Sequence, residues 1–202
     1  MTDPCIDSGS FELVDGTHLR PKDHMQWRHV ATNYTPATVL TFDINDGIAK
    51  DELLHSVQVQ WTNTTPINQY AYALLTRAGS KVILQGNCSG YIQTKAGQTS
   101  GVSPADPSSL TAISRFGIGF ERGMTALDTA YYVIAESRMA ERTMLFGDRV
   151  LLTPGETVKF KAELRFMSHY WDYRTPQGGL SETESNLDTG ASQLDVFAYP
   201  AL

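Results

Sequence analysis

The stretch Thr157–Phe166, TVKFKAELRF, decides the fold class that this 202-residue sequence predicts. Every second residue from Val158 to Phe166 is apolar, and the residues between them are Thr, Lys, Glu or Arg. Strict alternation with a period of two is the pattern of a β-strand that buries one face. A tight turn is expected directly before it, at Thr153-Pro154-Gly155-Glu156, because proline presets the turn backbone and glycine accepts positive φ. With Asp148–Leu152 upstream as a second strand, the segment predicts a β-hairpin.

Other stretches carry the same signal. Apolar residues alternate with glutamines in Ser56–Thr62, and Asn63-Thr64-Thr65-Pro66 ends that strand as a turn. Gln69–Thr76 is apolar on both faces, which favours a central strand covered on both sides. Further strands are expected at Lys81–Gln85, Tyr91–Thr94 and Ala112–Glu121. Strands at this spacing, with turn signals between them, predict an all-β fold, specifically a β-sandwich of the jelly-roll or Ig-like type.

Three segments predict other local structure. Lys95–Ser109 is made of Gly, Ser, Thr, Pro and Asp with little apolar content, and is expected to be a long surface loop. Lys50–His55 is expected to be a short helix, because acidic residues suit a helix start. Residues 128–146 are expected to begin as a strand and to continue as a helical or irregular turn at Glu136–Met144, where helix formers gather.

The composition changes along the chain predict three parts. Residues 1–36 hold few periodic positions and form an N-terminal extension, residues 37–174 form the β-sandwich domain, and residues 175–202 form a C-terminal arm. The arm begins polar and ends in the apolar stretch Leu194–Leu202. This composition is typical of an arm that docks on a neighbour, and the alternative is a frayed terminus.

The charge balance bears on the class of partner. The net charge is −6 and the pI is about 5.3, with no cluster of Lys and Arg, so a nucleic-acid partner is not expected. The N-terminus has neither a basic start nor an apolar core, and no apolar run approaches the roughly 20 residues of a spanning helix, so neither export nor membrane insertion is expected. Cys5 and Cys88 are expected to be free thiols in a reducing cytosol, and a disulfide between them is the alternative.

The sequence offers few candidates for chemistry. Gly86-Asn87-Cys88-Ser89-Gly90 has the shape of a nucleophile elbow, but that motif needs a helix after the nucleophile, and Tyr91–Thr94 favours a strand. A glycine-rich turn with a small thiol is the preferred interpretation. Two groups of possible metal ligands lack the spacing of a metal site: His18, His24 and His29, and Glu182, Glu184 and Asp188. We therefore expect no enzyme activity, no cofactor and no metal.

Aromatic residues are the best candidates for a functional surface. Tyr, Trp and Arg gather in the run 169–174, and these residue types are enriched at the centres of protein interfaces. Core packing, an assembly contact and glycan stacking by Trp171 and Tyr173 all remain open for this run. The full set of candidate interface residues is Trp27, Arg28, His29, Tyr170, Trp171, Tyr173, Phe197 and Tyr199.

The N-terminal region also carries a resemblance. The residues concerned are Cys5, Leu13-Val14-Asp15-Gly16, Leu19-Arg20 and Gln26-Trp27-Arg28-His29-Val30, followed by a β-rich domain with a Pro-Gly-Glu turn and a polar tail. Together they resemble small minor tail proteins of long-tailed phages that infect actinobacteria. The resemblance implies a virion structural protein near the tail tip or baseplate, made in the host cytoplasm and present in several copies. Its partners would be copies of itself and other virion proteins. A capsid decoration protein and a module that binds a host-surface glycan or receptor are the alternatives.

Overall fold

The computed structural model describes residues 10–14, 18–42, 51–85, 87–120, 134–139, 142–172 and 185–201. Most of them are β-strand and none is in an α-helix, which confirms the all-β prediction. The elements are β1 (Phe11–Val14), β2 (His18–Pro21), the 3-10 turn η1 (Asp23–Met25), β3 (Arg28–Thr35), β4 (Val39–Phe42), β5 (Asp51–Thr62), β6 (Gln69–Arg77), β7 (Ser80–Gln85), β8 (Asn87–Gly101), β9 (Thr111–Phe120), β10 (Ile134–Met139), β11 (Arg142–Leu152), β12 (Thr157–Asp172), β13 (Ser185–Asp188) and β14 (Ser192–Pro200).

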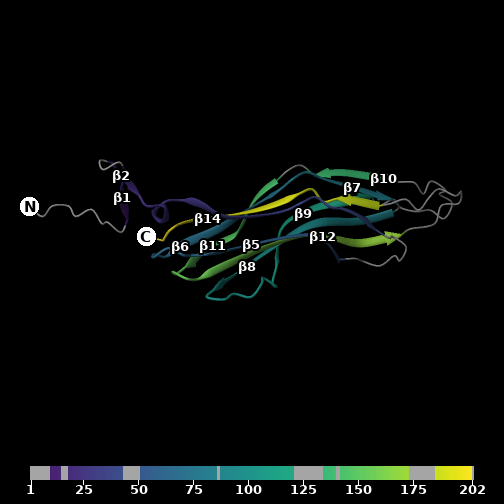
Figure 1. Ribbon diagram of the computed structural model, residues 1–202. Helices are drawn as coiled ribbons and strands as arrows, with labels where there is room; N and C mark the ends of the chain where they lie inside the picture. Colours follow the sequence, from purple (N-terminus) through teal and green to yellow (C-terminus); the bar gives the residue numbers. More distant parts are fainter. Residues whose placement is uncertain are drawn as a thin grey trace, which may run out of the picture.

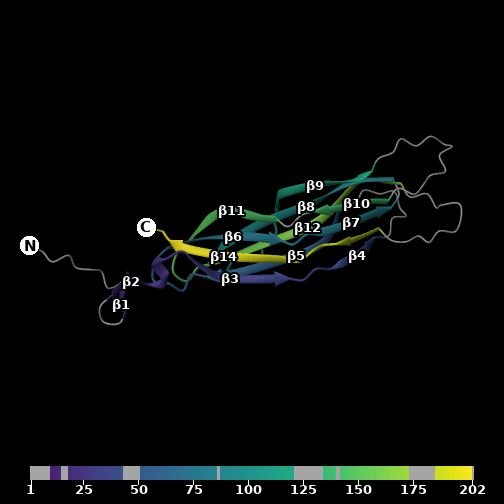
Figure 2. The same ribbon diagram turned by 90° about the horizontal axis from the view of Figure 1, so that it is seen from above.

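The strands form a sandwich of two long layers (Figures 1 and 2). The first layer contains two sheets, ordered β11-β6-β14-β3 and β10-β7-β13-β4. Strands at the same place in the two orders are consecutive in the sequence: β11 with β10, β6 with β7, β14 with β13, and β3 with β4. The two sheets are therefore one four-stranded layer with a break across it. The second layer is the sheet β5-β12-β8-β9.

The strand order identifies the sandwich as a jelly roll. From β3 to β14 the chain is one long antiparallel hairpin: β3 and β4 pair with β14 and β13, β5 with β12, β6 and β7 with β11 and β10, and β8 with β9. The hairpin is rolled up, so that β14 also pairs with β6 and β12 also pairs with β8. Two layers built from such a rolled hairpin are the jelly-roll arrangement, which decides between the two sandwich types that the sequence left open.

At the break across the first layer, Gly190 packs closely against the turn between β6 and β7. This residue has φ of 64°, and a Cβ atom added to it would lie 2.6 Å from the Gly79 carbonyl oxygen and 2.7 Å from that of Ala78. Only glycine adopts this conformation beside another backbone at that distance. The β6–β7 turn therefore packs directly on the β13–β14 turn, and the two turns interrupt the sheet at the same level.

The core lies between the layers and uses the alternation of β12 as predicted. Val158, Phe160, Ala162, Leu164 and Phe166 are all buried. Phe160 meets Phe146 of the first layer edge to face, with ring centroids 5.5 Å apart. The buried cluster consists of Val57, Val59, Ala71, Ala73, Leu75, Ala96, Phe146, Leu152, Val158, Phe160, Ala162, Leu194 and Val196.

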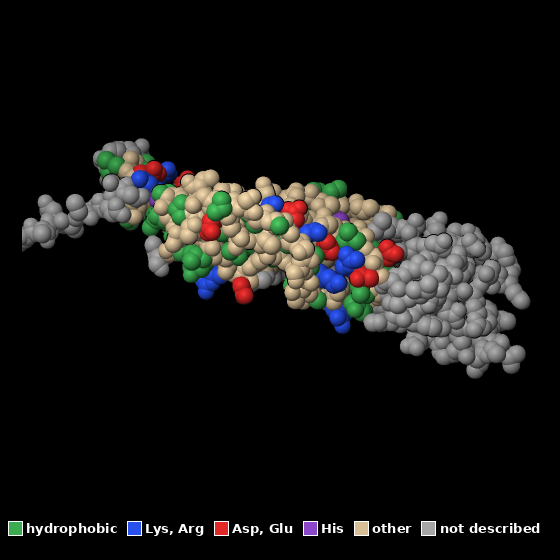
Figure 3. Space-filling model, turned by 90° about the horizontal axis from the view of Figure 1, so that it is seen from below, with side chains coloured by type: hydrophobic (Ala, Val, Ile, Leu, Met, Phe, Trp, Pro, Cys, Tyr) green, Lys and Arg blue, Asp and Glu red, His purple; other side chains and the backbone are tan. Residues whose placement is uncertain are grey.

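The other face of β12 carries a charged network. Arg165 contacts Asp51 at 2.5 Å and Glu163 at 2.9 Å, and Lys161 contacts Glu163 at 2.8 Å. Burial would raise the pKa of Glu163, but hydrogen bonds from Lys161 and Arg165 outweigh it and lower that pKa. Figure 3 shows acidic and basic side chains side by side on the face seen from below. The outside of the second layer is thus a polar, ion-paired surface.

The turn before β12 is confirmed, but the predicted hairpin is wrong. Glu156 N donates to Thr153 O at 3.1 Å, and Gly155 has φ of 87°. However, β11 pairs with β6 and β12 pairs with β5 and β8, so the turn crosses from one layer to the other. A short, strongly curved connection suits such a crossing as well as it suits a hairpin.

In the described residues, the segments expected to be helical are strands, and so is the first part of the predicted loop. β5 begins at Asp51, where a helix was predicted, and β10 and β11 cover 134–139 and 142–152, where a helical turn was predicted. Residues 95–101 of the predicted loop belong to β8, which pairs with β12 along its whole length, whereas 102–109 form an irregular connection to β9, as predicted. In each case a neighbouring strand supplies hydrogen-bond partners, and this tertiary contact overrides the local preference.

The strand pairing also differs from the predicted three-part division. β14, inside the predicted C-terminal arm, lies between β3 and β6, and its residues Leu194, Val196 and Ala198 are fully buried. The end of the chain is therefore a central strand of the sandwich. β3, inside the predicted N-terminal extension, belongs to the same sheet. The hairpin of β1 and β2 remains outside the layers, beyond the end of the sandwich where the C-terminus is marked (Figure 1). No helix in the described parts of the chain has the length and apolar character needed to cross a membrane.

Candidate functional site

The structure brings four of the candidate interface residues together on the outside of the first layer. Trp27, His29, Phe197 and Tyr199 lie there side by side with two tyrosines of β6. Arg28 is opposite Ala198, is half-buried and takes no part in this cluster. Tyr170 and Trp171 lie in β12 of the other layer, with backbones opposite Ser89 and Cys88. Their side chains and Tyr173 lie outside what the structure describes.

The cluster is a row of stacked rings, which we call the aromatic ladder: Trp27, Phe197, Tyr72, Tyr199 and Tyr70. Trp27 and Phe197 are parallel within 9°, with centroids 4.7 Å apart. Tyr72 also stacks on Phe197, with centroids 5.6 Å apart, and Tyr199 contacts both Tyr72 and Tyr70 at 6.3 and 5.6 Å. The ladder forms because these residues occupy outward positions on neighbouring strands, whose separation is close to the spacing of stacked rings.

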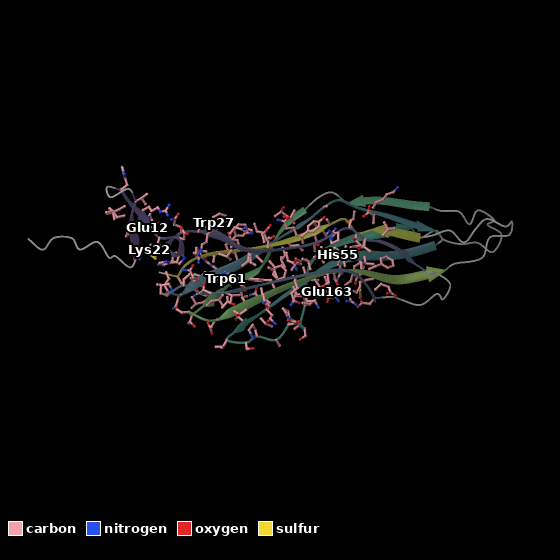
Figure 4. The ribbon with its side chains drawn as sticks, in the orientation of Figure 1. Glu12, Lys22, Trp27, His55, Trp61 and Glu163 are labelled. Carbon is pink, nitrogen blue, oxygen red and sulfur yellow. The ribbon has the colours of Figure 1, made fainter. Side chains whose placement is uncertain are left out.

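Trp27 is the open end of the ladder. Its Nε1 donates to the Tyr72 hydroxyl at 2.7 Å, which fixes the orientation of the indole. Its side chain is nevertheless 58% exposed, although it stacks on Phe197 and bonds Tyr72. Figure 4 places it on the upper side of the sandwich, close to the end that carries the hairpin. One ring face is therefore held by the protein and the other is presented to solvent.

Arg149 closes the opposite end of the ladder. Its Nη1 donates to the Tyr199 hydroxyl at 2.6 Å, and its guanidinium lies 5.5 Å from the centre of the Tyr70 ring. A guanidinium over an aromatic face adds a favourable cation–π contact. This end is covered by a cation, in contrast to the free face of Trp27.

A polar cluster borders the ladder along β14. The Asp195 carboxylate accepts hydrogen bonds from Gln193 Nε2 at 2.9 and 3.0 Å, and His29 Nε2 lies 3.1 Å from Asp195 Oδ1. Burial would raise the pKa of Asp195, but hydrogen bonds from Thr32, Gln193 and His29 lower it overall. The cluster thus holds an ionised carboxylate in a fixed orientation beside the rings.

The hairpin β1–β2 carries a second exposed apolar surface. Phe11 pairs with Pro21 and Leu13 pairs with Leu19, so these four side chains share one face. Leu13 is 60% exposed, Leu19 50% and Phe11 39%. The opposite face carries the ion pair between Glu12 and Arg20. This hairpin was not among the predicted elements, although the Asp15-Gly16 dipeptide between two short alternating runs is a known hairpin signal.

A buried polar cluster lies between the layers. His55, Arg77, Thr94 and Ser192 line a cavity of about 10 Å³, large enough for one water molecule. Arg77 Nη1 donates to Thr94 Oγ1 at 3.0 Å. Burial and the nearby positive charge of Arg77 lower the pKa of His55, so its imidazole is neutral at pH 7. The cavity has room for a structural water but not for a substrate.

The sequence candidates for chemistry are scattered. Cys88 lies inside a strand that continues from Asn87 to Gly101, so the strand–turn–helix of a nucleophile elbow is missing. His18, His24 and His29 lie on β2, η1 and β3, and Asp188 on β13, while Glu182 and Glu184 lie outside the described residues. Within the described ranges, no three His, Cys, Asp or Glu side chains are grouped as metal ligands.

Comparison with solved structures returns viral proteins. A chain of the infectious bursal disease virus Gx strain is 12% identical with a TM-score of 0.33, and the match covers 94% of this chain and 36% of that chain. A chain of the Gt strain is 9% identical with a TM-score of 0.26, and the match covers 94% of this chain and 41% of that chain. A chain of the T=1 particles derived from this virus is 10% identical with a TM-score of 0.26, and the match covers 95% of this chain and 40% of that chain. The present chain thus spans less than half of each of these chains. We assign the fold from the strand order, independently of these matches.

The sequence comparisons give a family. No curated protein matches the chain. A family model described as a domain of unknown function, DUF7172, matches residues 1–202. The chain therefore belongs to the DUF7172 family.

Proposed function

We propose that this protein is a structural component of a phage virion, a minor protein of the tail tip or baseplate that assembles with copies of itself and with other virion proteins. It is made in the host cytoplasm, needs no cofactor and catalyses no reaction. The observation that carries the proposal is the hairpin β1–β2, which presents an apolar face outside the sandwich.

The hairpin has the properties of a docking element. A two-stranded hairpin alone in water is marginally stable, so one with an exposed apolar face gains stability when a partner covers it. Its base is anchored, because Gln26 Nε2 donates to Pro21 O at 2.7 Å and Gln69 Nε2 donates to His24 O at 2.8 Å. The anchor joins the hairpin to the buried Gln69 of β6, so the sandwich holds the hairpin in a fixed direction.

The rest of the molecule fits the same role. A jelly roll is a rigid block whose core needs no ligand, and assembly proteins of many kinds use such blocks. The resemblance of the N-terminal region to minor tail proteins is the reason for proposing the tail as the location. A capsid decoration protein is the second candidate.

The location is tested on purified particles. Virions of the phage that encodes the protein are separated into heads and tails, and each fraction is analysed by quantitative mass spectrometry. The proposal expects the chain in the tail fraction in several copies. Recovery with heads would favour a decoration protein, and absence from particles despite abundance in the lysate would contradict a virion role.

The hairpin is tested by a matched pair of variants. Leu13→Ser with Leu19→Ser removes the apolar face, and we expect incorporation into particles to fall at least tenfold, because about 1.4 kcal/mol of lost contact changes an equilibrium tenfold. The control, Glu12→Gln with Arg20→Gln, changes two side chains on the opposite face and is expected to assemble normally. Equal incorporation of both double variants would show that the apolar face of the hairpin does not mediate assembly.

A further inference from the structure

Two exposed aromatic side chains mark the ends of a strip on the outside of the first layer. Trp27 precedes β3 and Tyr34 lies near its end, and each is 58% exposed. Tyr34 lies opposite Gln193, and His29 lies opposite Phe197, on which Trp27 stacks. All five side chains are on one face. At the rise of a β-strand, Trp27 and Tyr34 are roughly 20 Å apart.

The space between the two rings is polar. Thr32 lies opposite Asp195 in the strand register, and Asp195 also binds Gln193 and His29. Bonds from Thr32, Gln193 and His29 fill most of the roughly four acceptor positions of the Asp195 carboxylate, so further hydroxyl contacts fall mainly to the groups around it. Imidazole and amide groups add donors and acceptors on either side. The strip therefore alternates between an apolar ring, a hydrogen-bonding cluster and a second apolar ring.

This alternation discriminates among classes of ligand. A protein hot spot has a continuous apolar centre with polar groups at its rim, whereas here the polar groups are in the middle. A polyanion is disfavoured by the Asp195 carboxylate and by the net charge of −6. A pyranose ring has an apolar C–H face that stacks on an aromatic ring and a rim of hydroxyls that pair with carboxylates and amides. An open strip of this length suits an extended chain of such units.

We propose that the strip formed by Trp27, His29, Tyr34, Gln193 and Asp195 binds a glycan chain, with Trp27 and Tyr34 stacking on sugar rings and the polar cluster between them binding hydroxyls. This function goes beyond the structural role proposed above. A particle that carries several copies of the protein would then bind a surface polysaccharide through many weak contacts at once. It also places glycan recognition on the first layer and not on β12, the strand of the second layer that contains Trp171.

The test is direct binding of the full-length protein to a panel of hexasaccharides: cellohexaose, chitohexaose, mannohexaose and arabinohexaose. Titration calorimetry and ligand-observed NMR measure the dissociation constant, and we expect binding in the millimolar range or tighter for at least one of the four. Trp27→Ala and Tyr34→Ala are each expected to weaken that binding about tenfold, because one ring contact contributes on the order of 1 kcal/mol.

Three further variants sharpen the result. Trp27→Phe keeps a stacking surface and is expected to retain most of the affinity. Leu53→Ala and Val102→Ala remove exposed apolar side chains from other surfaces, and neither is expected to change binding. Circular dichroism and thermal melting of each variant verify that the sandwich is intact.

Several outcomes overturn the proposal. The first is no binding of any of the four sugars at about 10 mM, well above the weakest affinity expected. The second is binding that Trp27→Ala and Tyr34→Ala leave unchanged. The third is loss of self-association, without sugar binding, in Trp27→Ala, which would assign the strip to a protein contact. The structural role is tested separately, since Leu13→Ser with Leu19→Ser is expected to keep sugar binding and Trp27→Ala is expected to keep virion incorporation.

Discussion

Replacing Asn63 with alanine is expected to destabilise the sandwich more than any other single polar substitution at this end of the molecule. Asn63 is fully buried where β5 ends. Its Nδ2 donates to Ile67 O at 2.9 Å and to Leu152 O at 3.0 Å, and its Oδ1 accepts from the backbone N and the hydroxyl of Thr65 at 3.1 and 2.7 Å. Its backbone also bonds Gly155 and Glu156 of the turn that crosses between the layers. One side chain thus joins three pieces of chain.

The magnitude follows from these contacts. Each net hydrogen bond contributes about 1 kcal/mol, and a buried carbonyl or N–H left without a partner costs about 1–3 kcal/mol. Some of the freed groups will be reached by water, since the turns lie at the end of the sandwich. The free energy of unfolding is therefore expected to fall by about 3 kcal/mol in Asn63→Ala. Asn63→Asp is expected to cost at least as much, because its carboxylate would face two carbonyl oxygens.

Urea denaturation followed by far-UV circular dichroism measures the loss as a shift of the midpoint at constant m-value. Asn68→Ala is the matched control, since Asn68 lies in the same connection and is exposed. A loss below about 0.5 kcal/mol for Asn63→Ala, the level of an ordinary surface substitution, would refute the reasoning. A higher free energy of unfolding for Asn63→Asp than for Asn63→Ala at pH 7 would also refute it.

Three other substitutions follow from the fold. Phe160→Ala is expected to cost about 3–5 kcal/mol in chemical denaturation, because it empties a fully buried site, and Phe160→Leu is expected to cost less. The lowered pKa of His55 means that the unfolded chain binds a proton more readily than the folded one, so stability is full above pH 6.5 and declines as the pH falls below it. The thermal midpoint of His55→Gln is expected to depend less on pH in that range, and a midpoint with unchanged pH dependence would show that other groups cause the decline. Gly190→Ala is expected to prevent folding or to cost several times more than Gly101→Ala, because both have positive φ but only Gly190 lies against another backbone. Similar melting temperatures for the two glycine variants would argue against the close packing of turns at the break.

Part of the candidate surface was predictable and part was not. The residue types were informative, since Trp27, His29, Phe197 and Tyr199 were chosen for their chemistry and all lie on one outer surface. Their contact with Tyr70 and Tyr72 was not predictable, because these tyrosines are more than 40 positions away from Trp27 and more than 120 from Phe197 in the sequence. Asp195 and Gln193 gave no signal of their own, because their role depends on the strand that lies opposite them.

The sequence by itself determined which residues face inward along a strand. Side chains alternate across a strand whatever its neighbours are, so the buried face of Thr157–Phe166 and the outward glutamines of Ser56–Thr62 could be predicted from local pattern alone. The same locality explains the correct turn at Pro154-Gly155, because a turn depends on the backbone preferences of four residues.

Only the tertiary structure decided which strands are neighbours. Asp148–Leu152 and Thr157–Phe166 are joined by a short turn yet pair with different strands in different layers. Residues 192–200 have the composition of a terminal arm yet form a central strand of the first layer. Pairing depends on hydrogen bonds and packing between residues far apart in the chain, and alternation in one strand carries no information about its partner. The open face of Trp27 beside a fixed carboxylate exists only because β3, β14 and β6 meet in that order.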